Sequence, residues 1–290
     1  MTTKNSSERL RELLRKAVYA DMYDFVYRID EYQAFWKHER SEIFLALNKG
    51  YLRRKGEYLF LPGREQLIEK TQIAKVISNE KIKKTKAGLM PLIKLPWVRM
   101  VGITGTVGAN NAKLYDDIDI FVITDPNRVW ITRAFEIFYF GWFKKQRILL
   151  GKDRKDKFCF NVYMNTAELE VPDSKKTEFG AYQALLVNVI YGEDVYAKFL
   201  SENDWIEEVL RPISEFSEPA AVYTSYDSLL DILDLILGTV QKWRLKKVFS
   251  KKKGKYKFGD NLFLHFGDLA KGTEIKFEIV FEKFLKRIGI

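Results

Sequence analysis

Apolar positions recur at helical spacing through the first part of the chain. Three short stretches within residues 8–48 carry apolar side chains three or four positions apart. Asp30 is placed to cap the second stretch, and Gly50 follows the third. Residues 51–62 then read as a two-stranded hairpin with a charged turn. Three helices followed by a hairpin are typical of a winged helix, so residues 1–63 are predicted to form a winged-helix-like module that binds nucleic acid or another protein.

The middle of the chain alternates between strand and helix patterns. A long polar helix is predicted over 64–90, and two proline residues follow it. Strands are then predicted at 97–105, 117–123 and 157–165, with a loop or short helix after the first and a helix over 129–145 after the second. This order indicates a small α/β arrangement within residues 64–172.

From residue 174 onward the pattern is almost wholly helical. Apolar residues recur at spacings of three and four through three long segments, and a loop and a last helix follow them. Residues 173–290 are therefore predicted to form a C-terminal helical domain. The expected class is α+β, with a small mixed sheet flanked by a winged-helix-like module and a helical domain.

Composition narrows the class of protein. Of the 290 residues, 47% are hydrophobic and 30% are charged, which is typical of a soluble globular chain. The single cysteine, Cys159, excludes an internal disulfide and fits a reducing, cytoplasmic compartment. The N-terminus lacks the apolar core of a secretory signal. The most apolar segment, residues 129–143, is too short to span a bilayer and contains Arg133 and Glu136. We expect a buried helix there and no membrane contact, with a membrane-surface helix as the alternative.

Positive charge is concentrated near the C-terminus. The formal net charge is +10, and the stretch from Lys242 to Lys257 holds nine Lys or Arg and no acid. Such a stretch favours a polyanionic partner such as RNA, DNA or nucleotide phosphates. The alternative is a solvated helix end.

Two aspartates stand one residue apart on the second predicted strand. Successive side chains of a strand point to opposite faces, so Asp117 and Asp119 share one face and Ile118, Ile120 and Val122 share the other. The two carboxylates start roughly 7 Å apart and their tips can converge on a hard divalent cation such as Mg²⁺. The alternative is that these acids only end a strand in solvent.

A small-residue turn precedes the aspartates. Gly105 allows a tight turn and a close approach of the backbone, and the backbone N–H groups with the Thr106 hydroxyl can hold phosphate oxygens. Each feature alone is weak evidence. The turn and the Asp117-Ile-Asp119 pattern in this order, between apolar strands, favour a phosphate and metal site over a plain tight turn.

The residues "GITGT" and "DDIDIFVI" together resemble the signature of the nucleotidyltransferase superfamily, the fold of DNA polymerase beta, CCA-adding enzymes and kanamycin nucleotidyltransferase. That signature is a Gly-Ser or Gly-Gly turn followed by Asp-hydrophobic-Asp-hydrophobic, which maps onto Gly105-Thr106 and Asp117 to Ile120. The wider segment is similar to prokaryotic nucleotidyltransferase-domain proteins over about residues 20–210, and only its centre matches a motif. The resemblance implies Mg²⁺ or Mn²⁺ at Asp117 and Asp119, and binding of a nucleoside triphosphate, ATP included.

The pattern departs from that family at one ligand. The family supplies a third carboxylate from a later strand, and the corresponding residue here is Asn161, which strand alternation would place on one face with Cys159 and Tyr163. An amide can be a neutral ligand but not a base. Four acids elsewhere could substitute: Asp116, Asp153, Asp156 and Glu168.

Two cations are candidate phosphate ligands. Lys113, between the turn and the aspartates, could neutralise a triphosphate or be solvated. Arg133, one turn into the apolar helix, could bind an anion or pair with Asp125 or Asp116.

We therefore expect an enzyme that moves a nucleoside monophosphate from a nucleoside triphosphate to an acceptor hydroxyl, with release of pyrophosphate. RNA is the favoured acceptor, and a protein or small molecule is the alternative. The competing hypothesis is a catalytically degenerate nucleotide- or nucleic-acid-binding regulator that works with a partner protein, and Asn161 is the residue that favours it.

Overall fold

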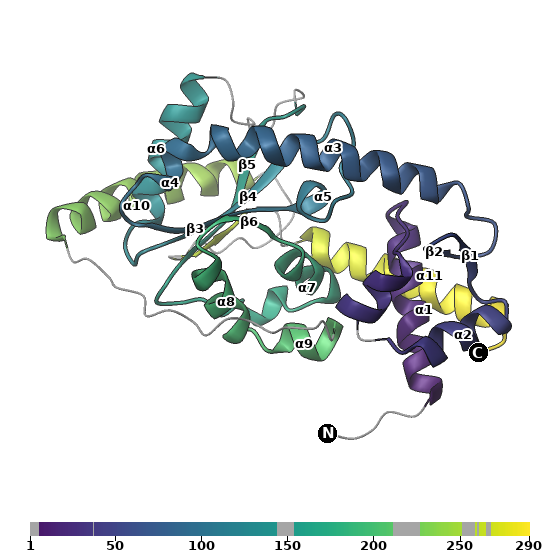
Figure 1. Cartoon of the computed structure of the whole chain (residues 1–290). Helices are drawn as coiled ribbons and strands as arrows, with labels where there is room; N and C mark the ends of the chain where they lie inside the picture. Colours follow the sequence, from purple (N-terminus) through teal and green to yellow (C-terminus); the bar gives the residue numbers. More distant parts are fainter. Residues whose placement is uncertain are drawn as a thin grey trace. The chain divides into compact units, whose positions relative to one another are not determined.

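The computed structural model describes residues 6–36, 38–143, 154–210, 227–250, 259, 261–264 and 268–290 of the chain. Within this part the chain forms two compact units (Figure 1). Unit 1 contains residues 6–76, 207–210 and 271–290, and unit 2 contains the others. Each unit joins segments that are far apart in the sequence. The three-part division into 1–63, 64–172 and 173–290 stays a prediction.

Unit 1 has the predicted order of three helical segments and a hairpin. Its elements are α1 (Ser6–Met22), the π-helical η1 (Glu31–Phe35), α2 (Arg40–Asn48), β1 (Arg53–Lys55) and β2 (Tyr58–Phe60), with most of α11 (Asp268–Ile288). The two strands pair antiparallel. Asp30 caps η1, as predicted, because its side chain accepts a hydrogen bond from the Glu31 backbone N–H. The identification of this unit as a winged helix stays a prediction.

The last helix stabilises unit 1 by packing on the first. The Arg15 guanidinium lies 4.7 Å from the centre of the Phe277 ring and pairs with Glu278. Leu13 and Leu14 of α1 are fully buried. Residues at the two ends of the chain therefore share one core.

Unit 2 is built on a five-stranded mixed sheet, so the α+β class is confirmed. The strand order is β6-β3-β4-β5-β7, and only β4 and β5 are parallel. The bounds are β3 Val98–Thr104, β4 Ile118–Thr124, β5 Phe158–Asn165, β6 Asn188–Tyr191 and β7 Leu262–Phe263. The three central strands agree with the sequence prediction.

The two edge strands contradict the sequence prediction. Strand β6 lies in a segment predicted as helix, and β7 lies in a segment predicted as loop. Both strands have four residues or fewer, which is too few for the two-residue period to be distinguished from a helical pattern. Their pairing with β3 and β5 is non-local and leaves no signal in the sequence nearby.

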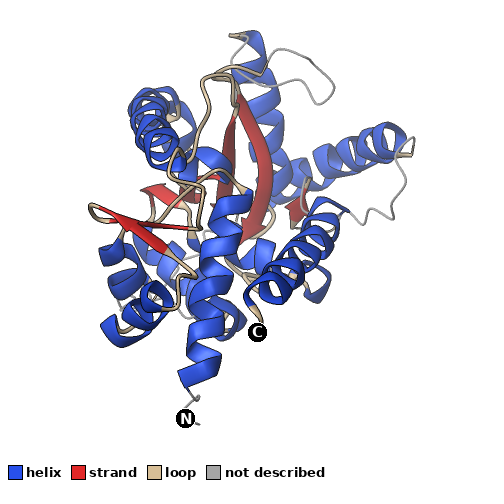
Figure 2. Ribbon diagram, turned by 90° about the vertical axis from the view of Figure 1, so that its right-hand side faces the viewer, coloured by secondary structure: helices blue, strands red, loops and turns tan. Residues whose placement is uncertain are grey.

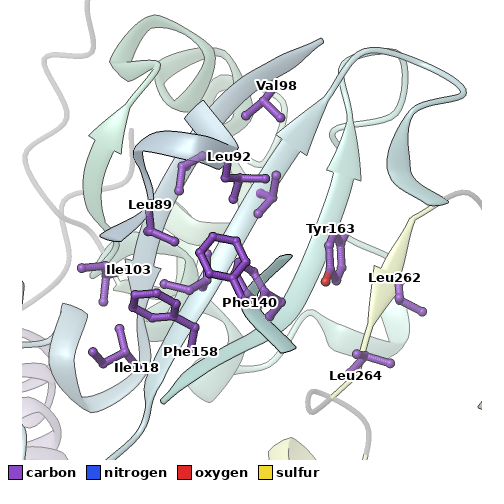
Figure 3. Close-up of a cluster of buried hydrophobic side chains, with 14 of the residues drawn as sticks. Leu89, Leu92, Val98, Ile103, Ile118, Phe140, Phe158, Tyr163, Leu262 and Leu264 are labelled. Atoms are coloured by element: carbon purple, nitrogen blue, oxygen red, sulfur yellow. The ribbon is translucent and has the colours of Figure 1, made fainter. Parts of the chain in front are cut away.

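Helices cover both faces of the sheet (Figures 1 and 2). One face, here called the core face, carries Ile118, Ile120 and Val122 and packs against helices that lie far apart in sequence. These helices are α3 (Leu67–Gly88), α4 (Met90–Ile93), α6 (Val129–Trp142) and α10 (Ser228–Phe249). Figure 3 shows part of this core around Phe140 and Phe158.

The opposite face, here called the aspartate face, is covered by α7 (Glu178–Leu185) and α8 (Glu193–Ser201). The ring centres of Phe121 in β4 and Phe199 in α8 lie 5.3 Å apart there. The remaining short helices are α5 (Gly105–Gly108), the 3₁₀ turn η2 (Asp173–Lys175) and α9 (Trp205–Leu210). Among the described residues, no helix combines the length and the apolar character needed to cross a bilayer.

Candidate metal and nucleotide site

The two aspartates lie at the start of β4, on the face predicted from the sequence. Ile118, Ile120 and Val122 belong to the buried core, so Asp117 and Asp119 point to the other side of the sheet. Both aspartates are half-buried. This position, where a central strand begins, keeps the carboxylates partly solvated, and the strand holds their backbone in place.

Strand β5 brings a thiol beside the two carboxylates. In the parallel pairing of β4 with β5, Asp119 is in register with Cys159, which is buried. One ligand atom from each of Asp117, Asp119 and Cys159 lies within 4.8 Å of the others. The sequence did not assign Cys159 to a site, because its place opposite Asp119 depends on strand register, which is a non-local property.

Asn161 lies beside Asp119, in a bulge of β5. Phe160 pairs with Ile120 and Val162 pairs with Phe121, so Asn161 is the extra residue between them. Its Nδ2 donates a hydrogen bond to Asp119 Oδ1 at 2.8 Å. Its Oδ1 is buried and has no hydrogen-bond partner among the described residues. The residue proposed from the sequence as a third ligand therefore contacts Asp119, and it supplies an amide in place of a carboxylate.

The same bulge corrects one sequence prediction. Simple alternation would place Cys159, Asn161 and Tyr163 on one face, but the extra residue shifts the alternation by one. Tyr163 therefore points into the core face, in the cluster with Phe158 and Phe140 (Figure 3).

Gly105 follows the last residue of β3 and begins α5, directly against Asp119. Its φ is +66°, in the left-handed region that favours glycine. A Cβ on this residue would lie 2.3 Å from Asp119 Oδ2. The predicted tight turn is thus present, and the close approach that it allows is to the carboxylate.

The polar groups around this turn have partners inside the protein. The Thr104 hydroxyl and the Gly105 backbone N–H both donate to Gln183 Oε1, at 3.1 and 3.2 Å. The Thr106 hydroxyl donates to Asp116 Oδ2 at 2.8 Å. For Gly105 N–H or the Thr106 hydroxyl to bind a phosphate, as the sequence predicts, each would have to exchange its present acceptor. Gln183 was missed by sequence reasoning, since it is one polar residue on an ordinary helix.

The structure does not bring the two predicted cations together. Lys113 is exposed in the loop between α5 and β4, where its backbone N–H donates to Asp116. Arg133 is buried on α6, which covers the core face, and donates to Gln241 Oε1 at 2.7 Å. The alternative pairing of Arg133 with Asp125 is not observed either, because Asp125 accepts two hydrogen bonds of 2.7 Å from Arg99.

A buried lysine fixes the loops that lead into β4 and β5. Lys81 of α3 is 3% exposed, donates to the Asp116 carbonyl at 2.9 Å and pairs with Asp156. Because Asp116 precedes Asp117 and Asp156 precedes β5, this one ammonium group holds both strand entrances. It is a positioning residue for the site.

None of the described acids supplies the third carboxylate at the aspartate pair. Asp156 pairs with Lys81, Asp116 accepts from Thr106, and Glu168 follows the far end of β5. Asp153 lies outside the described residues. Within the described part, the possible metal ligands are two carboxylates and a thiol, with the Asn161 amide oxygen nearby.

Glu136, on the core face, has a markedly raised pKa. Complete burial of Glu136 raises the pKa of its carboxyl group to about 8, and the Tyr163 hydroxyl donates to it. Glu136 is therefore protonated at neutral pH and belongs to the core.

The donor set fits a hard divalent cation in part. Mg²⁺ and Mn²⁺ prefer carboxylate and carbonyl oxygens, which Asp117, Asp119 and Asn161 can supply. The unpartnered Oδ1 of Asn161 is an oxygen that a bound ion could satisfy after a rotation of the amide. Cys159 is a softer donor, and its thiol suits transition metals better than Mg²⁺.

Comparisons with protein-family models, with curated proteins and with solved structures gave no match for this chain.

Proposed function

We propose that this protein is a metal-dependent nucleotidyltransferase that moves a nucleoside monophosphate from a nucleoside triphosphate to an acceptor hydroxyl and releases pyrophosphate. The observation that carries the proposal is the convergence of Asp117 and Asp119 beside the Gly105 turn. Two carboxylates next to a tight glycine turn are the minimum needed for phosphoryl chemistry that depends on positioning and charge neutralisation.

In this proposal Asp117 and Asp119 hold Mg²⁺ or Mn²⁺. A bound ion would neutralise phosphate charge and orient the phosphate oxygens. Gly105 leaves the space that the Asp119 carboxylate needs. Thr106 exchanges its bond to Asp116 for a phosphate oxygen, and the exposed Lys113 adds positive charge from the loop that follows α5. Arg133 has no part, because it is buried on the core face.

Every bond, leaving group and proton of the transfer step can be accounted for without a carboxylate at residue 161. The acceptor oxygen forms a bond to the α-phosphorus, the bond from that phosphorus to the bridging oxygen breaks, and pyrophosphate leaves. The Asn161 amide cannot take the hydroxyl proton, so the proton passes to Asp119 or to water. A slow transfer rate is the expected consequence.

RNA is the acceptor that we favour, with a protein side chain or a small molecule as alternatives. The preference for RNA rests on the basic stretch Lys242–Lys257, of which residues 251–257 lie outside the described part of the chain.

A second candidate function is a nucleotide-binding regulator without catalysis. The Asn161 contact favours it, because the amide occupies Asp119 Oδ1, one of the oxygens that a catalytic ion would use.

One experiment separates the two functions. The protein is incubated with each α-labelled nucleoside triphosphate, Mg²⁺ or Mn²⁺, and total tRNA or no added acceptor. We expect label transfer that is lost in Asp117→Asn and in Asp119→Asn. Asp173→Asn is the matched control, since the Asp173 side chain is 93% exposed in the same unit. Nucleotide binding with neither label transfer nor pyrophosphate release would favour the regulator.

A further inference from the structure

Helix α10 has one buried side and one exposed apolar side. The side that packs on α6 buries Asp234, Gly238, Gln241 and Leu245, at spacings of four, three and four. A second stripe, here called the apolar face of α10, is between 41% and 77% exposed. It consists of Leu229, Ile232, Leu233, Ile236, Val240 and Trp243. An exposed stripe of this length on one helix marks an interaction surface.

The acids of α10 are turned away from this face. Asp231 pairs with Arg128, and Asp234 accepts a hydrogen bond of 2.7 Å from the Ile131 backbone N–H of α6. Asp227, before the helix, caps its N-terminus by accepting from the Leu229 backbone N–H. The acidic groups of the helix are thus used for its own docking and capping.

The C-terminal end of α10 is basic. Arg244, Lys246 and Lys247 are exposed there, and the Lys247 ammonium lies 5.5 Å from the centre of the Trp243 ring. The sequence continues with five more lysines up to residue 257. Exposed positions of α10 therefore combine aliphatic side chains, one tryptophan and cations, with no exposed acid among them.

We propose that the apolar face of α10 binds the surface of an anionic lipid bilayer. A helix that lies in the plane of the interface buries aliphatic side chains at the acyl boundary, places tryptophan at the headgroup level and directs Lys and Arg to lipid phosphates. Helix α10 has all three: the aliphatic side chains and the tryptophan lie in one stripe, and the cations lie at its C-terminal end. The proposal concerns attachment to a surface, and α10 does not cross the bilayer.

Charge and side-chain type favour a bilayer over two other occupants. RNA held by the basic stretch would contact the lysines and Trp243 and leave the aliphatic stripe uncovered, because Leu229, Ile232, Ile236 and Val240 offer no ring on which a base could stack. A second copy of α10 would bury the aliphatic stripe, but it would bring one exposed acid, the N-cap Asp227, against the three exposed cations at the basic end. An anionic bilayer would both bury the aliphatic stripe and pair its lipid phosphates with the cations.

Helix α6, which packs on the buried side of α10, exposes aromatic side chains of its own. The two helices lie side by side in unit 2 (Figure 1), and the C-terminal half of α6 exposes Phe138 and Trp142, at 72% and 75%. The sequence analysis predicted a buried helix here, with a membrane-surface helix as the alternative. Its buried side does line the core, and its outer side adds exposed aromatic surface.

Sedimentation of the full chain with lipid vesicles tests the proposal. We expect binding to vesicles of mixed phosphatidylglycerol and phosphatidylcholine and none to phosphatidylcholine alone. Ile236→Asp with Val240→Asp should weaken binding by at least about tenfold, since two apolar contacts are replaced by charges that anionic lipid repels. Both residues are exposed, so folding should be unchanged, as circular dichroism would show.

The matched control is Ile275→Asp with Ile279→Asp on α11. These two residues are also four positions apart and are 63% and 52% exposed, against 55% and 59% for Ile236 and Val240. The control pair lies among glutamates in unit 1, and we expect it to leave vesicle binding unchanged.

Fluorescence gives a second readout that locates the contact. Lipids with brominated acyl chains should quench part of the tryptophan emission, and Trp243→Phe should remove most of that quenching. The proposal is overturned if the parent binds neither kind of vesicle, or if the Ile236/Val240 variant binds as tightly as the parent. It is also overturned if light scattering shows a dimer that this variant dissociates, or if the parent binds RNA and no vesicles.

Discussion

Gly105 and Asp119 are in contact across the ends of β3 and β4, and the contact leaves no room for a side chain at residue 105. A Cβ there would lie 2.3 Å from Asp119 Oδ2. The glycine is also required by its backbone, which has a φ of +66°. The turn of the candidate site and the position of the Asp119 carboxylate therefore depend on one another.

The first prediction concerns this contact. Gly105→Ala should displace the Asp119 carboxylate and weaken Mn²⁺ binding and any nucleotidyl transfer by about tenfold or more, since a shift of about 1 Å in a catalytic group has effects of this size. The strained backbone alone should cost roughly 1 kcal/mol of stability. Titration with Mn²⁺ and thermal unfolding measure the two effects.

Gly63→Ala is the control, because Gly63 has a φ of +84° and no atom within 4 Å of its Cβ position. It should show the stability cost without the loss of metal binding. Equal metal binding by Gly105→Ala and the parent would contradict the assigned role of this contact.

The second prediction concerns Asn161. Asn161→Asp replaces a donor to Asp119 with a like charge, so the variant without metal should unfold at a lower temperature than the parent. With Mn²⁺ or Mg²⁺ the third carboxylate should bind the ion, restore the unfolding temperature and raise the rate of transfer. Thermal unfolding with and without each ion measures this difference.

Asn161→Ala serves as the comparison, since it also removes the hydrogen bond but adds no charge. The metal should stabilise Asn161→Asp more than Asn161→Ala. The same metal response in both variants would show that residue 161 does not face the bound ion.

The third prediction concerns pH. The pKa of Glu136 is raised from 4.5 to about 8 by burial, so the folded state keeps a proton that the unfolded state loses above about pH 4.5. The free energy of unfolding contributed by this group therefore falls as the pH rises from about 4.5 to about 8. Glu136→Gln should remove this dependence and stabilise the protein near pH 8 by an amount on the order of a few kcal/mol.

Thermal unfolding at about pH 5 and about pH 8 measures the change, because the two values bracket most of the expected titration. Tyr163→Phe is a useful contrast: it removes the hydrogen bond to Glu136 and leaves the buried carboxyl group, so the pH dependence should remain. A parent and a Glu136→Gln variant with the same pH dependence would show that Glu136 ionises normally.

The sequence predicts local features of this fold well and non-local ones poorly. The strand with Asp117 and Asp119 and the cap at Asp30 follow from side-chain periodicity and local hydrogen bonding, and both are observed. Strands β6 and β7 were missed because each depends on pairing with residues distant in sequence.

In the candidate site, too, local features were predicted and non-local ones were missed. Gly105 and Asp119 were found from a local pattern, whereas Cys159 and Gln183 reach the site through strand register and helix packing. The bulge at Asn161 reversed the direction predicted for Tyr163, and one inserted residue gives no sequence signal of its own. Arg133 was assigned to the site because its helix follows β4, but that helix covers the core face.

The central claim is that Asp117 and Asp119 hold a divalent cation for nucleotidyl transfer. The most direct measurement is transfer of label from α-labelled nucleoside triphosphates in the presence of Mn²⁺, by the parent protein and by Asp119→Asn. We predict that the parent transfers label with release of pyrophosphate, and that Asp119→Asn folds normally but transfers none. Transfer at the parental rate by Asp119→Asn, or nucleotide binding by the parent without any transfer or pyrophosphate release, would contradict the claim.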